Sequence, residues 1–448
     1  MNKKIAFYSL ACLLFFIFTT TEAFSLTLYV DATEGKDGRF RGDDPASPFK
    51  TITYALNEAS TNTTIKVAPG EYNETIIIDK NQIWLEGAGA DKTIIIGKNP
   101  NNPTIRIVGP NRVGIRGFSI QGGYYGILCE FSFLICEDNI IIENNHVGLL
   151  AVSGSNVTIK DTIVKSKSGL GIEIYGNSSA TINKCKLSLN PWTALWVVNK
   201  SYARIEDTLI SSNDANGIQV SQGSSAWLIG NKIHSNKLSG LSVTGHSDAR
   251  LLGGNKIYEN ADLSGWRAGI GIYHGSQVTI NPDFSSDKDR ISENNGPGIF
   301  VGSNSELFLK SGIVTNNSGD GVRLKFDSCG RFEEGASITN NDGYGINRGD
   351  EEGDSKYWGE PGELSGNTLG STNCKGEVSE EEGISGEGGV SEEGISGEGS
   401  ITEEETSEEE TPEEDNHSVS EEGSSEEEGT SEEILNNGSD RVQDEENT

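Results

Sequence analysis

Residues 217–243 decide the fold, and they read G-I-Q-V-S-Q-G-S-S-A-W-L-I-G-N-K-I-H-S-N-K-L-S-G-L-S-V. Within them, aliphatic residues occupy every second position over 218–220 and 226–228, an aliphatic residue lies between two polar ones over 232–234, and the starting motif returns after 23 residues. Alternation with a period of two is typical of β-strands, and the connections are too short to hold a helix. Strands of this kind bury their apolar side only by coiling and stacking on the next copy. The stretch therefore predicts one three-stranded turn of a coil.

The same motif, a small residue followed by apolar, variable and apolar residues, recurs through the middle of the chain. Its first copies fall 23 residues apart, and two longer gaps of 31 and 27 residues predict loops that bulge from the coil. Asparagines before the motif, such as Asn213 and Asn236, fit turns in which side-chain amides stack from turn to turn. A β-propeller would need blades of about 40 residues, so we predict an all-β, three-faced parallel β-helix. The copies begin at Gly148, Gly171, Ala194, Gly217, Gly240, Gly271, Gly298, Gly321 and Gly345.

Charge is divided unevenly along the 448 residues. The chain has 35 basic and 68 acidic residues, a net charge of −33, and residues 376–448 hold 28 of the acids but one base, Arg441. This stretch has no aromatic residue and nine aliphatic ones, so it cannot bury enough surface to fold and is predicted to be a disordered acidic tail. The net charge excludes nucleic acid as a partner of the whole molecule. In the rest of the chain the acidic and basic residues nearly balance, so the net charge does not exclude an anionic sugar chain as a ligand of that part.

The amino terminus has the pattern of a signal peptide over residues 1–23. Lys3 and Lys4 precede an apolar run over 5–18, and Thr21 and Ala23 are small residues suited to cleavage after Ala23. No apolar stretch reaches the roughly 18 residues that cross a membrane. We therefore expect a secreted monomer, extracellular or periplasmic, without a membrane span.

Five cysteines follow the predicted signal peptide, and their odd, wide spacing is neither a disulfide framework nor a zinc pattern. We expect buried thiols, with one Cys129–Cys136 bridge as the alternative. The five are Cys129, Cys136, Cys185, Cys329 and Cys374.

The first hundred residues carry a likeness to a known family. It lies in Y-V-D at 29–31, P-A-S-P-F-K-T-I at 45–52, I-K-V-A-P-G-E-Y-N-E at 65–74 and G-A-G-A-D-K-T-I-I at 87–95. These segments resemble the opening of secreted right-handed parallel β-helix proteins of the pectin-lyase-like group, and the repeats extend the resemblance over most of 27–348. The resemblance implies a right-handed coil but no single function, because this group includes lyases, hydrolases, epimerases, binding proteins and adhesins. The aspartate and base motifs of its enzymes are missing. The Gly-His-Gly motif is missing as well, since Tyr273 precedes His274-Gly275.

The chain is expected to divide into a cap, a coil and a tail. Residues 24–64 form the cap, in which 49–60 reads as an amphipathic helix with Ile52, Ala55, Leu56 and Ala59 on one face. Such a helix would cover the open end of the coil, which is otherwise an edge open to pairing. The coil follows over 65–350, with early strands at 65, 76–78, 83–85 and 94–96. Residues 351–375 form a closing cap or linker before the tail.

Outward positions on the repeated strands align into columns of side chains. On the first strand the column is predicted to contain Leu150, Glu173, Trp196, Gln219, Ser242, Tyr273, Phe300 and Arg323. On the second it contains Thr158, Thr181, Arg204, Trp227, Arg250, Thr279 and Phe308. The third strand adds Lys186, Lys232, Lys256 and Arg290, with His234 and Tyr258 nearby.

These columns predict a face that binds an acidic polysaccharide or cell-surface glycan. An indole ring stacks on a sugar ring, and guanidinium groups bind its carboxylates or sulfates through forked donors. A structural or adhesin-like role, with aromatics that only cover gaps between faces, remains open. The predicted binding residues are Trp196, Arg204, Trp227, Arg250, Trp266, Arg267 and Tyr273.

A catalytic alternative places the site between the two long insertions, at 261–268 and 281–290. A base there, Lys256, His274 or Lys288, with a carboxylate pair or a bound Ca²⁺, would make the protein a polysaccharide lyase or uronate epimerase. The second insertion also holds Asp283, Asp287 and Asp289. A separate calcium site is predicted near the start of the chain, where glycines would let four carboxylates converge. Its candidate ligands are Asp31, Asp37, Asp43 and Asp44.

Overall fold

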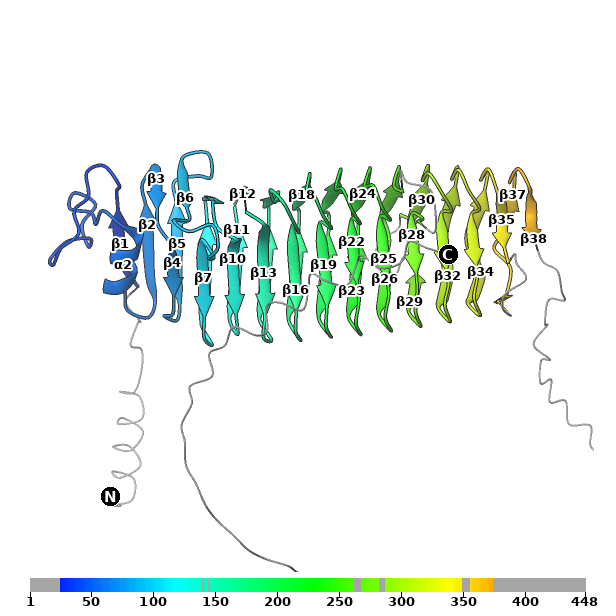
Figure 1. The fold of residues 1–448 in the computed structure, drawn as a ribbon, viewed down its shortest axis with the longest axis horizontal. Coiled ribbons are helices and arrows are strands. Elements are labelled where there is room, and N and C mark those ends of the chain that lie inside the picture. The colour runs from blue at the N-terminus through cyan, green and yellow to red at the C-terminus, as the bar shows by residue number, and fades with distance from the viewer. Residues whose placement is uncertain are drawn as a thin grey trace, which may run out of the picture. The chain divides into compact units, whose positions relative to one another are not determined.

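The computed structural model describes residues 25–138, 141–143, 145–261, 267–281, 287–348 and 355–373. In this part of the chain, short parallel strands wind into a single coil, and each full turn contributes three strands (Figure 1). The predicted all-β parallel β-helix is therefore confirmed. The predicted signal peptide, the acidic tail, Trp266, Asp283 and Cys374 lie outside the described residues.

The first strand of each turn belongs to a sheet of 13 strands, which we call row 1. Row 1 consists of β4 (Ile76–Ile78), β7 (Ile105–Val108), β10 (Tyr125–Glu130), β13 (Val147–Val152), β16 (Ile172–Tyr175), β19 (Leu195–Val198), β22 (Ile218–Val220), β25 (Leu241–Val243), β28 (Ile270–Ile272), β31 (Ile299–Val301), β33 (Val322–Leu324), β35 (Tyr344–Asn347) and β38 (Gly370–Asn373).

The other two strands of each turn form rows 2 and 3, which join in one sheet of 25 strands because β32 and β34 run unbroken through the corner. Row 2 consists of β1 (Leu26–Val30), β2 (Thr63–Val67), β5 (Ile83–Gly87), β8 (Arg112–Arg116), β11 (Phe133–Glu137), β14 (Asn156–Lys160), β17 (Ser179–Asn183), β20 (Tyr202–Glu206), β23 (Ser225–Ile229), β26 (Asp248–Leu251), β29 (Gln277–Ile280), the first parts of β32 (Glu306–Thr315) and β34 (Cys329–Thr339), and β36 (Lys356–Trp358). Row 3 consists of β3 (Gly70–Asn73), β6 (Thr93–Ile96), β9 (Ser119–Gln121), β12 (Ile141–Glu143), β15 (Ile163–Val164), β18 (Lys186–Ser188), β21 (Leu209–Ser211), β24 (Lys232–His234), β27 (Lys256–Tyr258), β30 (Arg290–Ser292), the second parts of β32 and β34, and β37 (Glu363–Ser365).

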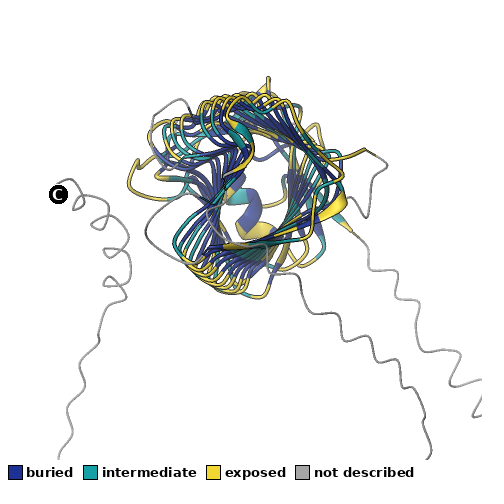
Figure 2. Ribbon diagram, turned by 90° about the vertical axis from the view of Figure 1, so that its right-hand side faces the viewer, coloured by how far each residue is buried: buried dark blue, intermediate teal, exposed yellow. Residues whose placement is uncertain are grey.

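Alternation along each strand fills the interior of the coil with aliphatic side chains. In β20, Ala203 and Ile205 are fully buried, whereas Tyr202, Arg204 and Glu206 point outward. Seen along the axis, buried residues line the inside and exposed residues follow the turns (Figure 2). Each fully buried Ile, Leu or Val contributes about 1.5–3 kcal/mol, so the repeated apolar stations supply most of the stabilisation.

Polar side chains stack at each of the three corners. Between rows 3 and 1, the Nδ2 of each asparagine donates to the Oδ1 of the next, as from Asn213 to Asn236 at 2.7 Å. This confirms the predicted asparagine turns. A serine ladder, including Ser201 and Ser224, lines the corner between rows 1 and 2. These bonds satisfy polar groups that the tight turns bury.

Helix α2 (Ile52–Glu58) covers the amino-terminal end of the coil, as predicted. Its residues Ile52, Ala55 and Leu56 are buried, and Thr51 caps it by accepting from the Tyr54 amide. Figure 2 shows the helix across the bore of the coil. At the other end, Tyr357 and Leu364 pack against the core.

The structure corrects the predicted repeat after Gly240. Strand β25 pairs with β28 so that Ser242 lies opposite Gly271, not opposite Tyr273. The motif glycine is therefore Gly269, and both longer turns contain 29 residues. The error arose because Gly269-Ile270 and Gly271-Ile272 offer two overlapping copies of the motif, and sequence alone does not distinguish a two-residue slip.

Candidate functional site

Three neighbouring turns of row 2 bring Arg204, Trp227 and Arg250 into one outward column, which we call the row-2 strip. Arg204 pairs with Trp227 and Trp227 with Arg250 in the strand register. The Arg250 guanidinium carbon lies 6.0 Å from the centre of the Trp227 ring, within cation–π range. The Tyr202 ring meets Trp227 edge-on at 5.8 Å. The strip therefore has a partly exposed indole between two cations, as predicted.

Carboxylates on the same strands offset the charge of this strip. The Arg204 Nε lies 2.5 Å from Glu206 Oε1, and the Arg250 Nε lies 3.8 Å from Asp248 Oδ1. Burial raises the pKa of Asp248, while Arg250 lowers it. The two arginines thus remain hydrogen-bond donors at the surface, but the strip as a whole is close to neutral.

On row 1, the predicted aromatic column is real but less exposed than expected. Trp196 is half-buried, and its indole N–H donates to the Ser221 hydroxyl at 2.9 Å. Phe300 is only 1% exposed, so it is not an aromatic in water. Its ring stacks on Tyr273 at 5.4 Å.

Tyr273 does not belong to this column in the strand register, but its ring extends over a column position. A side chain at Gly271 would collide with the Tyr273 ring, so the ring folds back over the position that Gly271 leaves open. Burial raises the pKa of the Tyr273 phenol to about 12, while a hydrogen bond with the Ser239 side chain and the charge of Arg267 lower it. Tyr273 and Arg267 therefore lie near each other on row 1, separate from the row-2 strip.

Row 3 carries a cationic column on successive turns. Lys232, Lys256 and Arg290 are partners in the strand register, and all three are exposed. None of the three forms an ion pair with a described residue. Next to them, the His234 and Tyr258 rings stack at 4.7 Å. Lys186 belongs to the same column two turns earlier, beyond Leu209.

The three predicted bases do not converge. Lys256 lies in row 3, and His274 lies in the turn after β28, where its Nδ1 is 2.9 Å from the Thr244 hydroxyl. Lys288 lies in the turn before β30 and donates to the Gly335 carbonyl at 2.8 Å. They occupy different corners or faces of the coil.

Asp289 corrects another expectation. We predicted it in a surface loop, but its side chain is fully buried inside the corner between rows 2 and 3. Its Oδ1 accepts from the backbone and side-chain amides of Asn255.

Three of the four predicted calcium ligands, Asp31, Asp37 and Asp44, accept hydrogen bonds from backbone amides. Asp31 accepts from the amides of Thr33 and Glu34, and Asp44 from that of Ala46. Asp37 accepts from the amides of Lys50 and Thr51. Across the described ranges, no three His, Cys, Asp or Glu side chains form a group that could hold a metal ion. The cap carboxylates thus organise turns, and Asp43 adds no fourth ligand to a cluster.

Cysteines occupy core positions. Cys129, Cys136 and Cys185 are buried free thiols, and Cys329 is a partly exposed free thiol. The alternative Cys129–Cys136 bridge is not formed; both thiols are free, Cys129 on β10 and Cys136 on β11. Burial raises the pKa of Cys129 and Cys185 to about 11, which makes them poor nucleophiles.

One titratable group escaped our choice of candidate residues. Glu173, on row 1 beside Trp196, has a pKa raised to about 7 because burial disfavours its charged form. Burial raises the pKa of Tyr125 to about 12, and the charges of Tyr124 and Glu173 raise it further. A carboxyl group that is half-protonated near neutrality can donate a proton. Its position in an outward column was visible in the sequence, but its burial was not.

The row-2 column also continues beyond the predicted residues. After Thr279 come Phe308, Arg331 and Trp358, each opposite the next in the register. The predicted column ends at Phe308, although Arg331 follows at the regular interval of 23 residues; Trp358 comes 27 residues after Arg331 and departs from the period.

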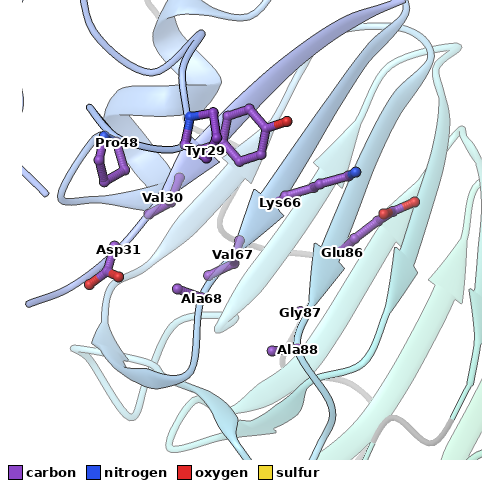
Figure 3. Close-up of a pocket in the computed structure, with 11 residues that line it drawn as sticks. Tyr29, Val30, Asp31, Pro48, Lys66, Val67, Ala68, Glu86, Gly87 and Ala88 are labelled. Atoms are coloured by element: carbon purple, nitrogen blue, oxygen red, sulfur yellow. The ribbon is translucent and has the colours of Figure 1, made fainter. Parts of the chain in front are cut away.

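Two shallow pockets lie elsewhere on row 2. One, of about 370 Å³, is formed where the cap meets the first turns, with Tyr29, Lys66 and Glu86 on its wall (Figure 3). The other, of about 490 Å³, is bordered by Arg112 and the exposed Phe133. Neither contains a residue of the row-2 strip.

In the portion of the chain that the structure describes, no helix is long and apolar enough to cross a membrane.

Comparison with known proteins identifies the coil. A family model described as "Right handed beta helix region" matches residues 71–201 and 170–347. Among solved structures, the catalytic unit of a thermostable GH87 alpha-1,3-glucanase from Streptomyces thermodiastaticus strain HF3-3 is 15% identical, with 77% of this chain and 70% of that chain covered and a TM-score of 0.50.

Two further solved structures share the coil at similar distance. The mannuronan C-5 epimerase AlgE6 A-module of Azotobacter vinelandii is 15% identical, with 73% of this chain and 91% of that chain covered and a TM-score of 0.46. The pectate lyase Pel9A is 12% identical, with 57% of this chain and 75% of that chain covered and a TM-score of 0.42. At these identities the likeness concerns the fold alone.

Proposed function

Because the chain belongs to the right-handed β-helix family, we propose that it uses the outer face of its coil to bind an acidic polysaccharide. The proposal includes secretion to the extracellular space or periplasm, where such glycans occur. It agrees in substrate class with the glucanase, whose name denotes an enzyme of polysaccharides. The binding face itself is argued from this chain's own residues.

The observation that carries the proposal is the register of the row-2 strip. Arg204, Trp227 and Arg250 are on consecutive turns, which are about 4.8 Å apart. A chain-like ligand that lies along the coil axis would meet a cation, an indole and a second cation in sequence. The Trp227 ring would stack on a sugar face, and the guanidinium groups would donate to its oxygens.

The cations of row 3 support an acidic ligand. Lys232, Lys256 and Arg290 lie on neighbouring turns around the corner from the strip. Their like charges repel one another at this spacing, and the described residues provide no carboxylate partner. A polyanion would relieve that repulsion and would be attracted over a distance of about a Debye length, 8 Å at physiological ionic strength.

A tryptophan replacement tests this function. We expect Trp227→Ala to weaken binding to pectate, alginate or a glycosaminoglycan about tenfold, since ring stacking and buried apolar area are lost. Affinity electrophoresis in gels with each glycan measures the effect. Trp192→Ala is the matched control, because it removes a 51% exposed indole that lies outside the strip. Equal retardation of both variants and the wild type would contradict the proposal.

A further inference from the structure

We propose that Arg331, together with Phe308 and Trp358, forms a second station on row 2 that binds the carboxylate of a uronic-acid unit. This station, and not the row-2 strip, would then discriminate an acidic chain from a neutral one. The inference rests on the proposed function, since it names the acid-binding subsite of the same outer face.

The geometry of Arg331 is that of a preorganised anion site. Its guanidinium carbon lies over the Phe308 ring at 5.0 Å and over the Trp358 ring at 5.5 Å. Since Phe308 and Trp358 lie on the turns before and after Arg331, the two rings flank the guanidinium group, which is exposed to a ligand. Since the side chain is already held, binding a carboxylate in a forked geometry would cost little conformational entropy.

Arg331 also differs from the arginines of the strip in its charged neighbours. Arg204 and Arg250 each have a carboxylate within 4 Å, namely Glu206 and Asp248. Among the described residues Arg331 forms no ion pair, although Glu333 follows it at the spacing that separates Arg204 from Glu206. Arg331 is therefore an exposed, uncompensated cation.

A second cation lies beside it. Lys356 is exposed and occupies the neighbouring position on β36, opposite Cys329. Burial raises the pKa of the Cys329 thiol, and Glu306 raises it further, whereas Arg331 and Lys356 both lower it. The thiol thus lies within reach of the Glu306 carboxylate and of both cations, which places Lys356 as a second exposed cation near Arg331.

The two stations are aligned for one ligand. Trp227, Arg250, Thr279, Phe308 and Arg331 follow one another in the register. Four turns at about 4.8 Å place Arg331 roughly 19 Å from Trp227 along the axis, with the smaller Thr279 between the stations. An extended glycan along this column would stack on Trp227 and present an acid group to Arg331.

A matched pair of ligands separates the two roles. Oligogalacturonate and its methyl ester share one backbone but differ in charge, so the ratio of their dissociation constants measures acid recognition. We expect Arg331→Gln to weaken oligogalacturonate binding about tenfold, as for loss of a hydrogen-bonded charge pair, and to leave the ester unchanged. Arg331→Lys should restore the preference only in part, because it keeps the charge without the planar fork. Arg112→Gln is the matched control, because it removes an exposed arginine of row 2 that lies outside both stations, and it should change the preference less than about threefold.

The outcomes are distinct for the two proposals. If Arg331→Gln keeps the wild-type preference while Trp227→Ala weakens both ligands, the acid-binding station is overturned and the glycan-binding function stands. If the wild type binds neither ligand, nor alginate or a glycosaminoglycan, the proposed function fails and the station fails with it. A loss of preference in Arg331→Gln at an unchanged thermal unfolding midpoint supports the station.

Discussion

At the scale of single residues, Asp289 occupies a position where its ladder would favour an asparagine. Asn231 donates its side-chain amide to Asn255, and Asn255 donates to Asp289. The second carboxylate oxygen of Asp289 is buried without a hydrogen-bond partner among the described residues. In the next turn the corresponding position is Gly312, which has no side chain to donate to it. The ladder therefore ends on a carboxyl group that the interior favours in its neutral form.

The substitution Asp289→Asn tests this view. Burial raises the pKa of Asp289 from 3.8 to about 6. A carboxyl group with a raised folded-state pKa favours folding below its unfolded pKa, and this contribution is lost as the pH rises through about 6. The shift corresponds to about 3 kcal/mol at pH 7. We expect Asp289→Asn to raise the free energy of unfolding by about 1–3 kcal/mol at pH 7, and by clearly less near pH 4. Urea unfolding at both pH values measures this, and an equal gain at both would contradict it.

The orientations of Asp289 and Tyr273 could not be predicted from the sequence. Both lie beside an insertion, where the 23-residue period no longer fixes which residue points inward. Arg204, Trp227 and Arg250 could be predicted as neighbours because the period is unbroken there, and one residue per turn decides a whole column. Glu173 could be placed in its column as well, but its raised pKa depends on burial by other side chains, which a repeat pattern does not report.

At the scale of elements, a buried carboxylate from outside helix α2 holds the first turn of that helix. Glu74 is 5% exposed and accepts from the amides of Ile52 and Thr53 at the start of α2, at 2.9 and 2.8 Å. It also accepts from the Thr53 hydroxyl at 2.5 Å. These first-turn amides have no partner within the helix. The sequence predicted the helix from its apolar face, but the capping carboxylate comes from the turn after β3 and was not foreseen.

Replacing this carboxylate should loosen the cap. We expect Glu74→Ala to lower the free energy of unfolding by about 2–4 kcal/mol, since buried charged hydrogen bonds are lost and amides are left unpaired. Glu74→Gln should cost less, because its amide oxygen still accepts. Chemical denaturation measures both, with Glu71→Ala, an exposed position on β3, as the control. A Glu74→Ala protein as stable as the control would show that water replaces the carboxylate.

At the scale of the whole molecule, fold and function are predicted from different features. The fold follows from a pattern repeated many times, so single errors such as the slip at Gly271 leave it intact. Function depends on a few outward side chains, and the repeat pattern does not specify these residues because most outward positions do not pack in the core. The family and the solved structures accordingly establish the coil, while the ligand has to be argued from Trp227, Arg331 and their neighbours.

Net charge is the property of the whole chain that bears most directly on an acidic ligand. Residues 376–448 carry 28 acids and one base, so a chain that ends at residue 375 loses most of the net charge of −33. Like charges repel over a Debye length, which is about 30 Å at 0.01 M salt and 3 Å at 1 M. We therefore expect the shortened chain to bind oligogalacturonate more tightly than the full chain at low salt, and the difference to vanish near 1 M. Isothermal titration at both salt concentrations measures this, with the methyl ester as the uncharged control. Weaker binding by the shortened chain would instead assign the acidic segment a direct part in recognition.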